Sequence, residues 1–126
     1  MAKWSLDANM DLMLAGVALC DELFVCSGQP ANYAGIAAVA LATVALTPGD
    51  GNGDYAIADD TSGRKVTVAQ QADIPIDVTG TATHIALAVG GATDVLRYVT
   101  TCTSQALVDT GTVTVPAWKV GVSDPT

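Results

Sequence analysis

The chain contains one histidine, His84, and this residue is the first candidate for chemistry. A nucleophile system of the Ser/His/Asp or Cys/His kind needs such a base. Thr83, Asp94 and Cys102 belong to the same predicted hairpin and are its candidate partners. Strand alternation, however, directs His84 and Cys102 to opposite sides if both strands share one core face. Because no Gly-x-Ser-x-Gly or other nucleophile signature accompanies them, we predict a surface or interface histidine and no catalytic residue.

A second candidate is the segment DGNGDYAIADDT, residues 50–61, which begins like a calcium-binding loop. Asp50, Asn52 and Asp54 match the first three side-chain ligands of such a loop. The sixth position, where glycine makes the sharp turn, is Tyr55, and the twelfth, where a glutamate closes the coordination sphere, is Thr61. We therefore predict a turn that feeds a strand and assign no metal ligand. An oxygen cage of non-standard geometry that uses Asp59 and Asp60 stays open as an alternative.

Two weaker features complete the inventory. SGRKV, residues 62–66, holds two of the five basic residues, but it leads into a strand, whereas a phosphate site needs a glycine-rich loop before a helix. We predict a solvated turn there, with an electrostatic contact to an acidic neighbouring subunit as the alternative.

Trp4 and Trp118 are interpreted as core or interface anchors rather than a sugar-binding face, because the chain has few aromatic residues. No cofactor is assigned.

The elements that position these residues should form one domain, residues 1–126, because a chain of this length buries one core. Thirteen acidic and five basic residues give a formal net charge of −8. This charge repels phosphate backbones and anionic lipid, so we expect neither nucleic acid nor a membrane as a direct partner. The acidic residues are dispersed, which is typical of a self-repelling surface.

The cysteines and the first twenty residues indicate that the chain is not exported. Three cysteines form no metal-binding spacing, and an odd number makes a poor disulfide framework, so we expect a reducing compartment. Residues 1–20 have the outline of a lipoprotein signal that ends at Cys20. Asp7 and Asp11 interrupt its apolar run, and Leu19 stands where a small residue is required.

The N-terminal half contains one clear helix pattern. Residues 5–19 carry Leu6, Met10, Met13, Leu14 and Val17 at helical spacing, after Ser5 or Asp7 as a cap. ELFVC, residues 22–26, is typical of a short buried strand. The alanine-rich segment 36–46 is ambiguous, and we favour a strand over residues 43–46.

The C-terminal half shows the alternation of strands much more clearly. Alternating apolar positions occur in residues 63–68, 73–78, 83–89, 96–102, 111–115 and 117–122. Gly90 and Gly91 separate the third and fourth of these segments, which predicts a hairpin. Pro75 cannot donate to a ladder, so its strand should lie at an edge or contain a bulge. About seven strands after one helix predict a mainly β fold, an antiparallel β-sandwich or small barrel.

Several phrases of the sequence resemble a known group of proteins. They are CSGQPANYA (26–34), GDYAIADDTSGRKVTV (53–68), GTATHIALA (80–88), YVTTCTSQAL (98–107) and VPAWKVGVSDP (115–125). Together they resemble small virion structural proteins of tailed bacteriophages over most of the chain. The resemblance implies a capsid decoration or cement protein that is assembled in the host bacterial cytoplasm. It carries over no functional residue, since the matching phrases are strands and turns.

The resemblance also implies partners. We expect the major capsid protein or other virion subunits, and a homo-oligomer, because repeated modest contacts stabilise a symmetric lattice. The N-terminal arm with Trp4 and the apolar segment 36–46 are the candidate anchors. A tail or head-fibre component that binds a receptor or carbohydrate is the alternative. A small hydrolase that uses His84 is a third hypothesis, and the lack of a nucleophile signature disfavours it.

Overall fold

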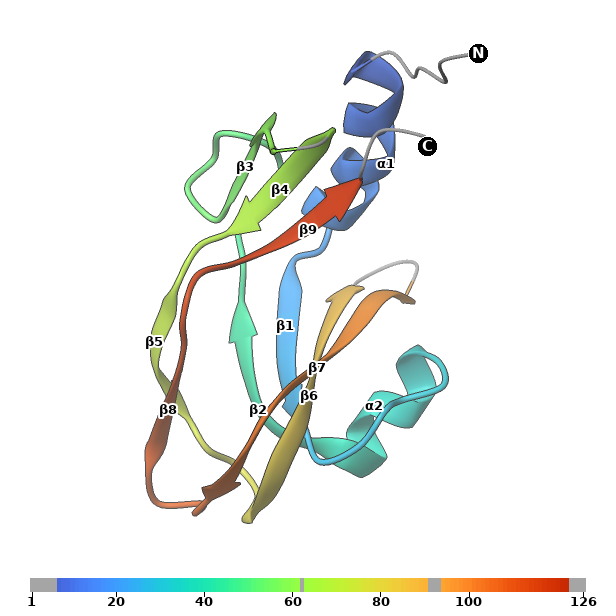
Figure 1. Cartoon of the computed structure of the whole chain (residues 1–126). Coiled ribbons are helices and arrows are strands. Elements are labelled where there is room, and N and C mark those ends of the chain that lie inside the picture. Colours follow the sequence, from blue (N-terminus) through green and yellow to red (C-terminus); the bar gives the residue numbers. More distant parts are fainter. Residues whose placement is uncertain (1–6, 62, 91–93, 123–126) are drawn as a thin grey trace.

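A computed structural model describes residues 7–61, 63–90 and 94–122, and this part of the chain is mainly β with antiparallel sheets (Figure 1). It contains two helices and nine strands. These are α1 (Asp7–Ala18), β1 (Glu22–Cys26), α2 (Tyr33–Val39), β2 (Ala40–Ala45), β3 (Tyr55–Asp59), β4 (Arg64–Val68), β5 (Gln71–Pro75), β6 (Gly80–Val89), β7 (Val95–Leu107), β8 (Thr112–Val115) and β9 (Trp118–Val122). The predicted fold class is confirmed, with a β-sandwich as the better description.

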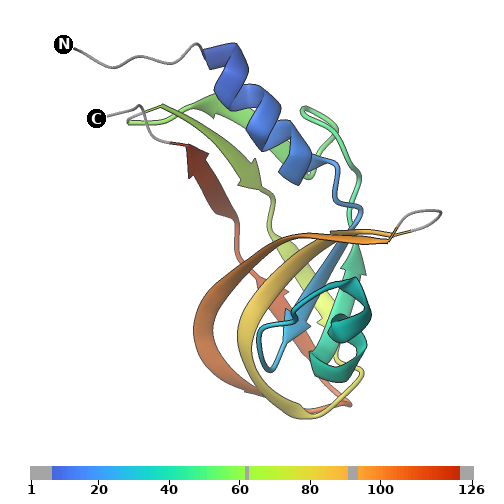
Figure 2. The same ribbon diagram turned by 90° about the vertical axis from the view of Figure 1, so that its right-hand side faces the viewer.

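The first layer is a four-stranded sheet in the order β2-β1-β6-β7. Its two longest strands, β6 and β7, form the predicted hairpin, with Ile85 opposite Thr100 and Leu87 opposite Tyr98. The hairpin curls strongly (Figure 2), and its register shifts at two points. Such irregularities bend a strand and increase its twist, so the outer strand β7 curves away from a flat sheet.

The second layer is a long, bent, two-stranded ribbon with one added strand. β4 continues into β5, and β8 continues into β9, so that β4 pairs with β9 and β5 with β8. The ladder is interrupted between the Val68–Trp118 and Gln71–Val115 pairs. Pro116 lies in this interruption and has no N–H to donate, which accounts for a bend at this point. β3 pairs with β4 and widens the upper end to three strands.

The two layers are joined along one side only. The backbone N–H groups of Asp77 and Val78 both donate to the carbonyl of Leu41 in β2, and Ala42 forms a bridge with Ile76. On the other side, β7 pairs only with β6 and β8 only with β5 among the described residues. The layers therefore form a sandwich that is closed at β2 and open between β7 and β8. The described strands do not form a closed barrel.

Helix α1 confirms the predicted N-terminal helix within the described residues, while Ser5 and Leu6 lie outside them. The helix covers the three-stranded sheet (Figure 2) and contacts β4 most extensively. Leu14 and Ala18 are buried beneath it. Met13, one of the apolar residues at helical spacing, is 65% exposed. Only a narrow stripe of α1 is buried, because this short helix packs few side chains against the sheet.

The ambiguous segment 36–46 contains both candidate structures in succession. Its first part belongs to α2, which Asn32 caps by accepting a hydrogen bond from the Gly35 N–H at 2.8 Å. Its second part is β2, so the predicted start of the strand at residue 43 is wrong and the strand begins at Ala40. Leu41 and Ala42 are buried in the chain's own core, which explains the apolar character of this segment.

The prediction for Pro75 is confirmed, since β5 pairs with β8 alone and is irregular between Gln71 and Ile74. Asp73 within this irregularity has a φ of 55°, a left-handed conformation that bulges commonly require. The turn predicted in segment 50–61 does feed a strand, β3, whose bounds the sequence pattern did not give. Its pattern is weak because Ala56 and Ala58 are exposed between Tyr55 and Ile57.

Candidate functional site

His84 lies in the middle of β6, opposite Cys26 on one side and Thr101 on the other. Its Nδ1 is 2.8 Å from the Thr83 hydroxyl. Cys102 faces the other side of the sheet, together with Ile85, which alternates with His84. Asp94 adjoins the start of β7, about 20 Å along the hairpin from His84 at 3.3 Å per residue. The structure therefore brings only Thr83 of the three candidate partners into contact with His84.

The carboxylates of segment 50–61 are occupied by donors of the protein itself. Asp50 accepts a hydrogen bond from the Ile57 N–H at 2.9 Å, and Asp54 accepts from the Thr47 N–H at 2.6 Å and from Gln71 at 3.0 Å. Within the described ranges, no group of three or more His, Cys, Asp or Glu side chains could hold a metal ion. The segment is built as a hydrogen-bonded turn.

The basic residues of SGRKV are not all solvated, and the prediction of a solvated turn is wrong for Arg64. Its guanidinium pairs with Asp11 of α1 at 2.8 Å and with Asp59 at 2.7 Å, and only 18% of the side chain is exposed. These two carboxylates raise the pKa of Arg64. The residue fastens α1 to the three-stranded sheet. Ser62, which precedes it, lies outside the described residues.

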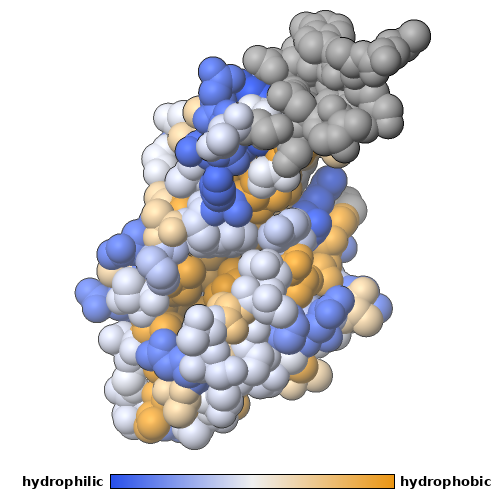
Figure 3. All heavy atoms as spheres, in the orientation of Figure 1, coloured by the Kyte–Doolittle hydropathy of each residue, from blue (hydrophilic) through white to orange (hydrophobic). Residues whose placement is uncertain are grey.

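An apolar groove lies on the unjoined side of the sandwich and is hereafter called the β7–β8 groove. Two adjoining hollows of about 270 and 300 Å³ form it. They share Ile85, Cys102, Val115 and Pro116, so they are parts of one continuous depression. Figure 3 shows apolar atoms along the middle of this face. The groove lies where the two layers fail to meet.

Each wall of the groove is a strand with one unpaired side. The wall on the β7 side includes Thr103 and Gln105, and the opposite wall includes Val113 and Thr114 of β8. The backbone N–H and C=O groups on the outer side of an edge strand are free to pair with another strand. In the described part of the chain, neither wall uses these groups for a ladder across the groove.

The upper end of the groove is formed by an aromatic pair. Trp118 of β9 stacks on Tyr98 of β7, with ring centroids 6.0 Å apart and planes inclined by 26°. This contact bridges the two layers above the open side. The Trp118 indole nitrogen is buried and has no hydrogen-bond partner among the described residues. Trp118 is therefore an anchor between layers, in agreement with the core alternative proposed for it, while Trp4 lies outside the described residues.

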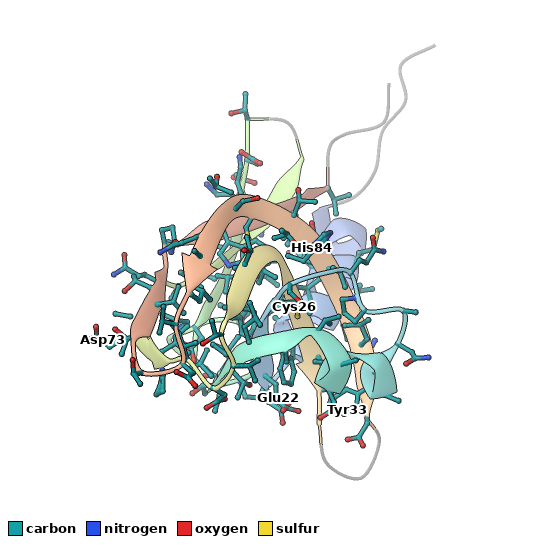
Figure 4. All side chains as sticks on the ribbon, turned by 90° about the horizontal axis from the view of Figure 1, so that it is seen from below. Glu22, Cys26, Tyr33, Asp73 and His84 are labelled. Carbon is teal, nitrogen blue, oxygen red and sulfur yellow. The ribbon has the colours of Figure 1, made fainter. Side chains whose placement is uncertain are left out.

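A smaller hollow of about 240 Å³ lies beneath α2. The Tyr33 hydroxyl donates to Glu22 at 2.9 Å at its margin, and Figure 4 shows these two side chains beside each other. This hydrogen bond raises the pKa of Tyr33 to about 12. The pair is remote from His84, and the other residues described as lining the hollow are not titratable. It joins α2 to β1.

The three cysteines are free thiols and differ in accessibility. Cys20 and Cys26 are fully buried, and burial raises their pKa values to about 12 and about 11. Cys102 is half-buried at the floor of the β7–β8 groove, and desolvation also raises its pKa. Sequence reasoning did not identify the groove. The only available signals were Pro116 and the exposed polar residues of the second half of β7.

Comparisons with protein-family models, with curated proteins and with solved structures found no significant match to this chain. Neither described helix has the length and apolar character needed to cross a membrane.

Proposed function

We propose that this protein is a structural component of a tailed-bacteriophage particle that decorates the capsid through contacts with neighbouring subunits. The observation that carries the proposal is the β7–β8 groove, an apolar depression between two strands with unpaired edges. Exposed apolar surface of this kind marks protein interaction sites. The resemblance of the strand and turn phrases to small virion proteins supplies the phage context.

A second exposed apolar surface supports an assembly role. On α1 and the turn after it, Leu12 is 73% exposed, Met13 65% and Leu19 53%. These side chains lie on the side of the helix that faces away from the sheet. A decoration protein needs surfaces for both the shell and its own neighbours. The groove and this helix surface provide two separate candidates.

The experiment is to add purified protein to particles or empty shells that lack it and to measure binding by co-sedimentation. Electron microscopy of the complex would show regular additional density on the shell, and light scattering of the free protein would give its oligomeric state. Failure to bind any part of the particle would overturn the proposal. Binding to host-surface glycans, together with density at the tail or head fibres alone, would instead support the receptor-binding alternative.

A further inference from the structure

We propose that the β7–β8 groove binds an extended segment of a different protein as an added β-strand. The occupant has small aliphatic or β-branched side chains at alternate positions and basic residues at its ends. This inference deepens the proposed function. That the donor is a shell subunit rests on the proposed function, whereas occupancy of the groove by such a strand rests on the groove itself.

The first argument is the backbone chemistry of both walls. Among the described residues, β7 and β8 do not pair with each other. On the opposite side of the sandwich, hydrogen bonds to the Leu41 carbonyl connect the two layers. A single inserted strand can pair with two facing edges at once, which satisfies backbone groups that otherwise need water. A compact apolar ligand has no donors and acceptors in this repeating pattern. The walls are thus suited to a polypeptide.

The second argument is the shape and lining of the groove. The β7 wall runs from Thr100 to Gln105, which corresponds to about 20 Å of extended chain at 3.3 Å per residue. The floor is made of apolar side chains, including Val25 and Ile85. Alternate side chains of an inserted strand would point down onto this floor, and the others would point to solvent. Apolar residues are therefore required only at every second position.

The third argument is charge, and it separates a foreign segment from a second copy of this chain. The chain carries a formal net charge of −8. Lys119 is the one charged residue among those described as lining the groove, and Asp60 already neutralises it through contacts of 2.9 Å. A second acidic copy would be repelled on approach, whereas a segment with basic ends would be attracted. Charge complementarity thus favours a partner of opposite charge.

The test uses Trp118, whose ring lies at the end of the groove, as a fluorescent reporter in the full chain with Trp4→Phe. The probe is a capped peptide of sequence Lys-Thr-Val-Thr-Val-Thr-Val-Lys. Two control peptides replace the central valine by proline or both lysines by glutamate. Proline removes a backbone donor without adding charge, so it tests strand pairing. We expect saturable binding of the probe and at least tenfold weaker binding of both controls.

Two pairs of variants place the peptide in the groove. Thr103 and Gln105 line it and are exposed, while their neighbours Ser104 and Ala106 are exposed but outside its lining. Thr103→Phe should weaken probe binding at least tenfold, while Ser104→Phe should change it less than twofold. Gln105→Phe and Ala106→Phe form the second pair, for use if either first variant unfolds. Circular dichroism of every variant establishes that it is folded.

Several results would overturn the inference. One is that substitutions in the groove lining and at the neighbouring positions weaken probe binding equally. Another is that the proline peptide binds as tightly as the probe. A third is that the probe does not bind at millimolar concentration. Equal binding of the glutamate peptide would contradict the charge argument. A change in the oligomeric state of the free chain with Thr103→Phe would assign the groove to a second copy. Binding of decanoate in place of the probe would assign it to a small apolar ligand.

The same variants separate this inference from the proposed function. If the wild-type chain decorates shells and Thr103→Phe decorates them equally well, the groove is not the contact, although the proposed function stands. If the wild-type chain binds no particle but binds the probe peptide as expected, the proposed function fails and the strand-binding groove remains. Loss of shell binding with Thr103→Phe and its retention with Ser104→Phe would support both.

Discussion

The hydroxyl of Tyr55 donates a hydrogen bond of 2.7 Å to the backbone carbonyl of Cys20, although the two residues are 35 positions apart. Tyr55 is 1% exposed and is the largest fully buried side chain in the described part of the protein. The bond joins the start of β3 to the turn that ends α1. One side chain thus fixes the helix, the three-stranded sheet and the entry into β1.

Tyr55→Phe should lower the free energy of unfolding by about 1–2 kcal/mol, because it leaves the buried Cys20 carbonyl without this donor. Urea denaturation followed by circular dichroism measures the change. Tyr98→Phe is the matched control, since the Tyr98 hydroxyl has no hydrogen bond to a described residue and only its ring contacts Trp118. An equal loss in both variants would show that the Tyr55 hydroxyl contributes no specific stabilisation.

The stacked pair of Tyr98 and Trp118 predicts a different result for two substitutions at one position. Trp118→Phe keeps an aromatic ring against Tyr98 and removes a buried indole N–H that has no partner among the described residues. We expect a change within about 1 kcal/mol, since loss of an unsatisfied donor offsets the smaller ring. Trp118→Ala should lower the free energy of unfolding by about 3–5 kcal/mol. Urea midpoints of the three proteins distinguish these outcomes, and equal losses would contradict the argument.

The fold class could be predicted from local sequence because the deciding signals are local. Val66 and Val68 are fully buried and alternate with partly exposed residues, and the hairpin of β6 and β7 follows the same rule around Gly90. The sequence left segment 36–46 undecided because alanine suits helices and threonine suits strands, and both occur within a few residues. Packing of Ile36 and Leu41 into one core decides between them.

The groove could not be predicted, because it depends on which strands do not pair. The pattern of β7 predicts a strand with one polar side, but it does not show whether Thr103 meets another strand or solvent. That depends on the register shift near His84 and on the interruption at Pro116 between β8 and β9. Local alternation determines which side of a strand is buried. It does not determine strand order.

The different burial of the three thiols predicts stepwise labelling by a thiol reagent. At pH 8 Cys102 should react first, because it is half-buried at the groove floor, while Cys20 and Cys26 are fully buried. Burial raises the pKa of both to about 12 and about 11, which lowers their thiolate fraction. Mass spectrometry should find one modified cysteine under native conditions and three in urea.

Cys102→Ser is the control for this labelling and should remove the fast phase alone. Modification of Cys102 should also abolish binding of the strand peptide, because the reagent would occupy the groove floor. Rapid modification of all three thiols in the folded protein would contradict the burial seen here. Labelling of Cys102 without any effect on peptide binding would show that the peptide does not bind over this thiol.

The ion pair between Lys119 and Asp60 predicts a dependence of stability on pH at acid values. The Lys119 ammonium and the Thr61 N–H hold the pKa of Asp60 below its usual value. A carboxyl with a lowered folded-state pKa stabilises the protein fully above the unfolded value of about 3.9. That contribution is lost as the pH falls through the folded-state pKa. The urea midpoint should therefore decrease below about pH 4, and the decrease should be smaller in Asp60→Asn.

The control for this pH dependence is Asp77→Asn, since Asp77 is exposed and has no ion pair among the described residues. It should keep the acid dependence of the wild type. Lys119 follows Trp118 in β9, so protonation of Asp60 removes a side-chain contact next to the residue at one end of the groove. Trp118 fluorescence in the Trp4→Phe protein should change over the same pH range. Identical acid profiles for Asp60→Asn and the wild type would show that this ion pair does not hold β9 in place.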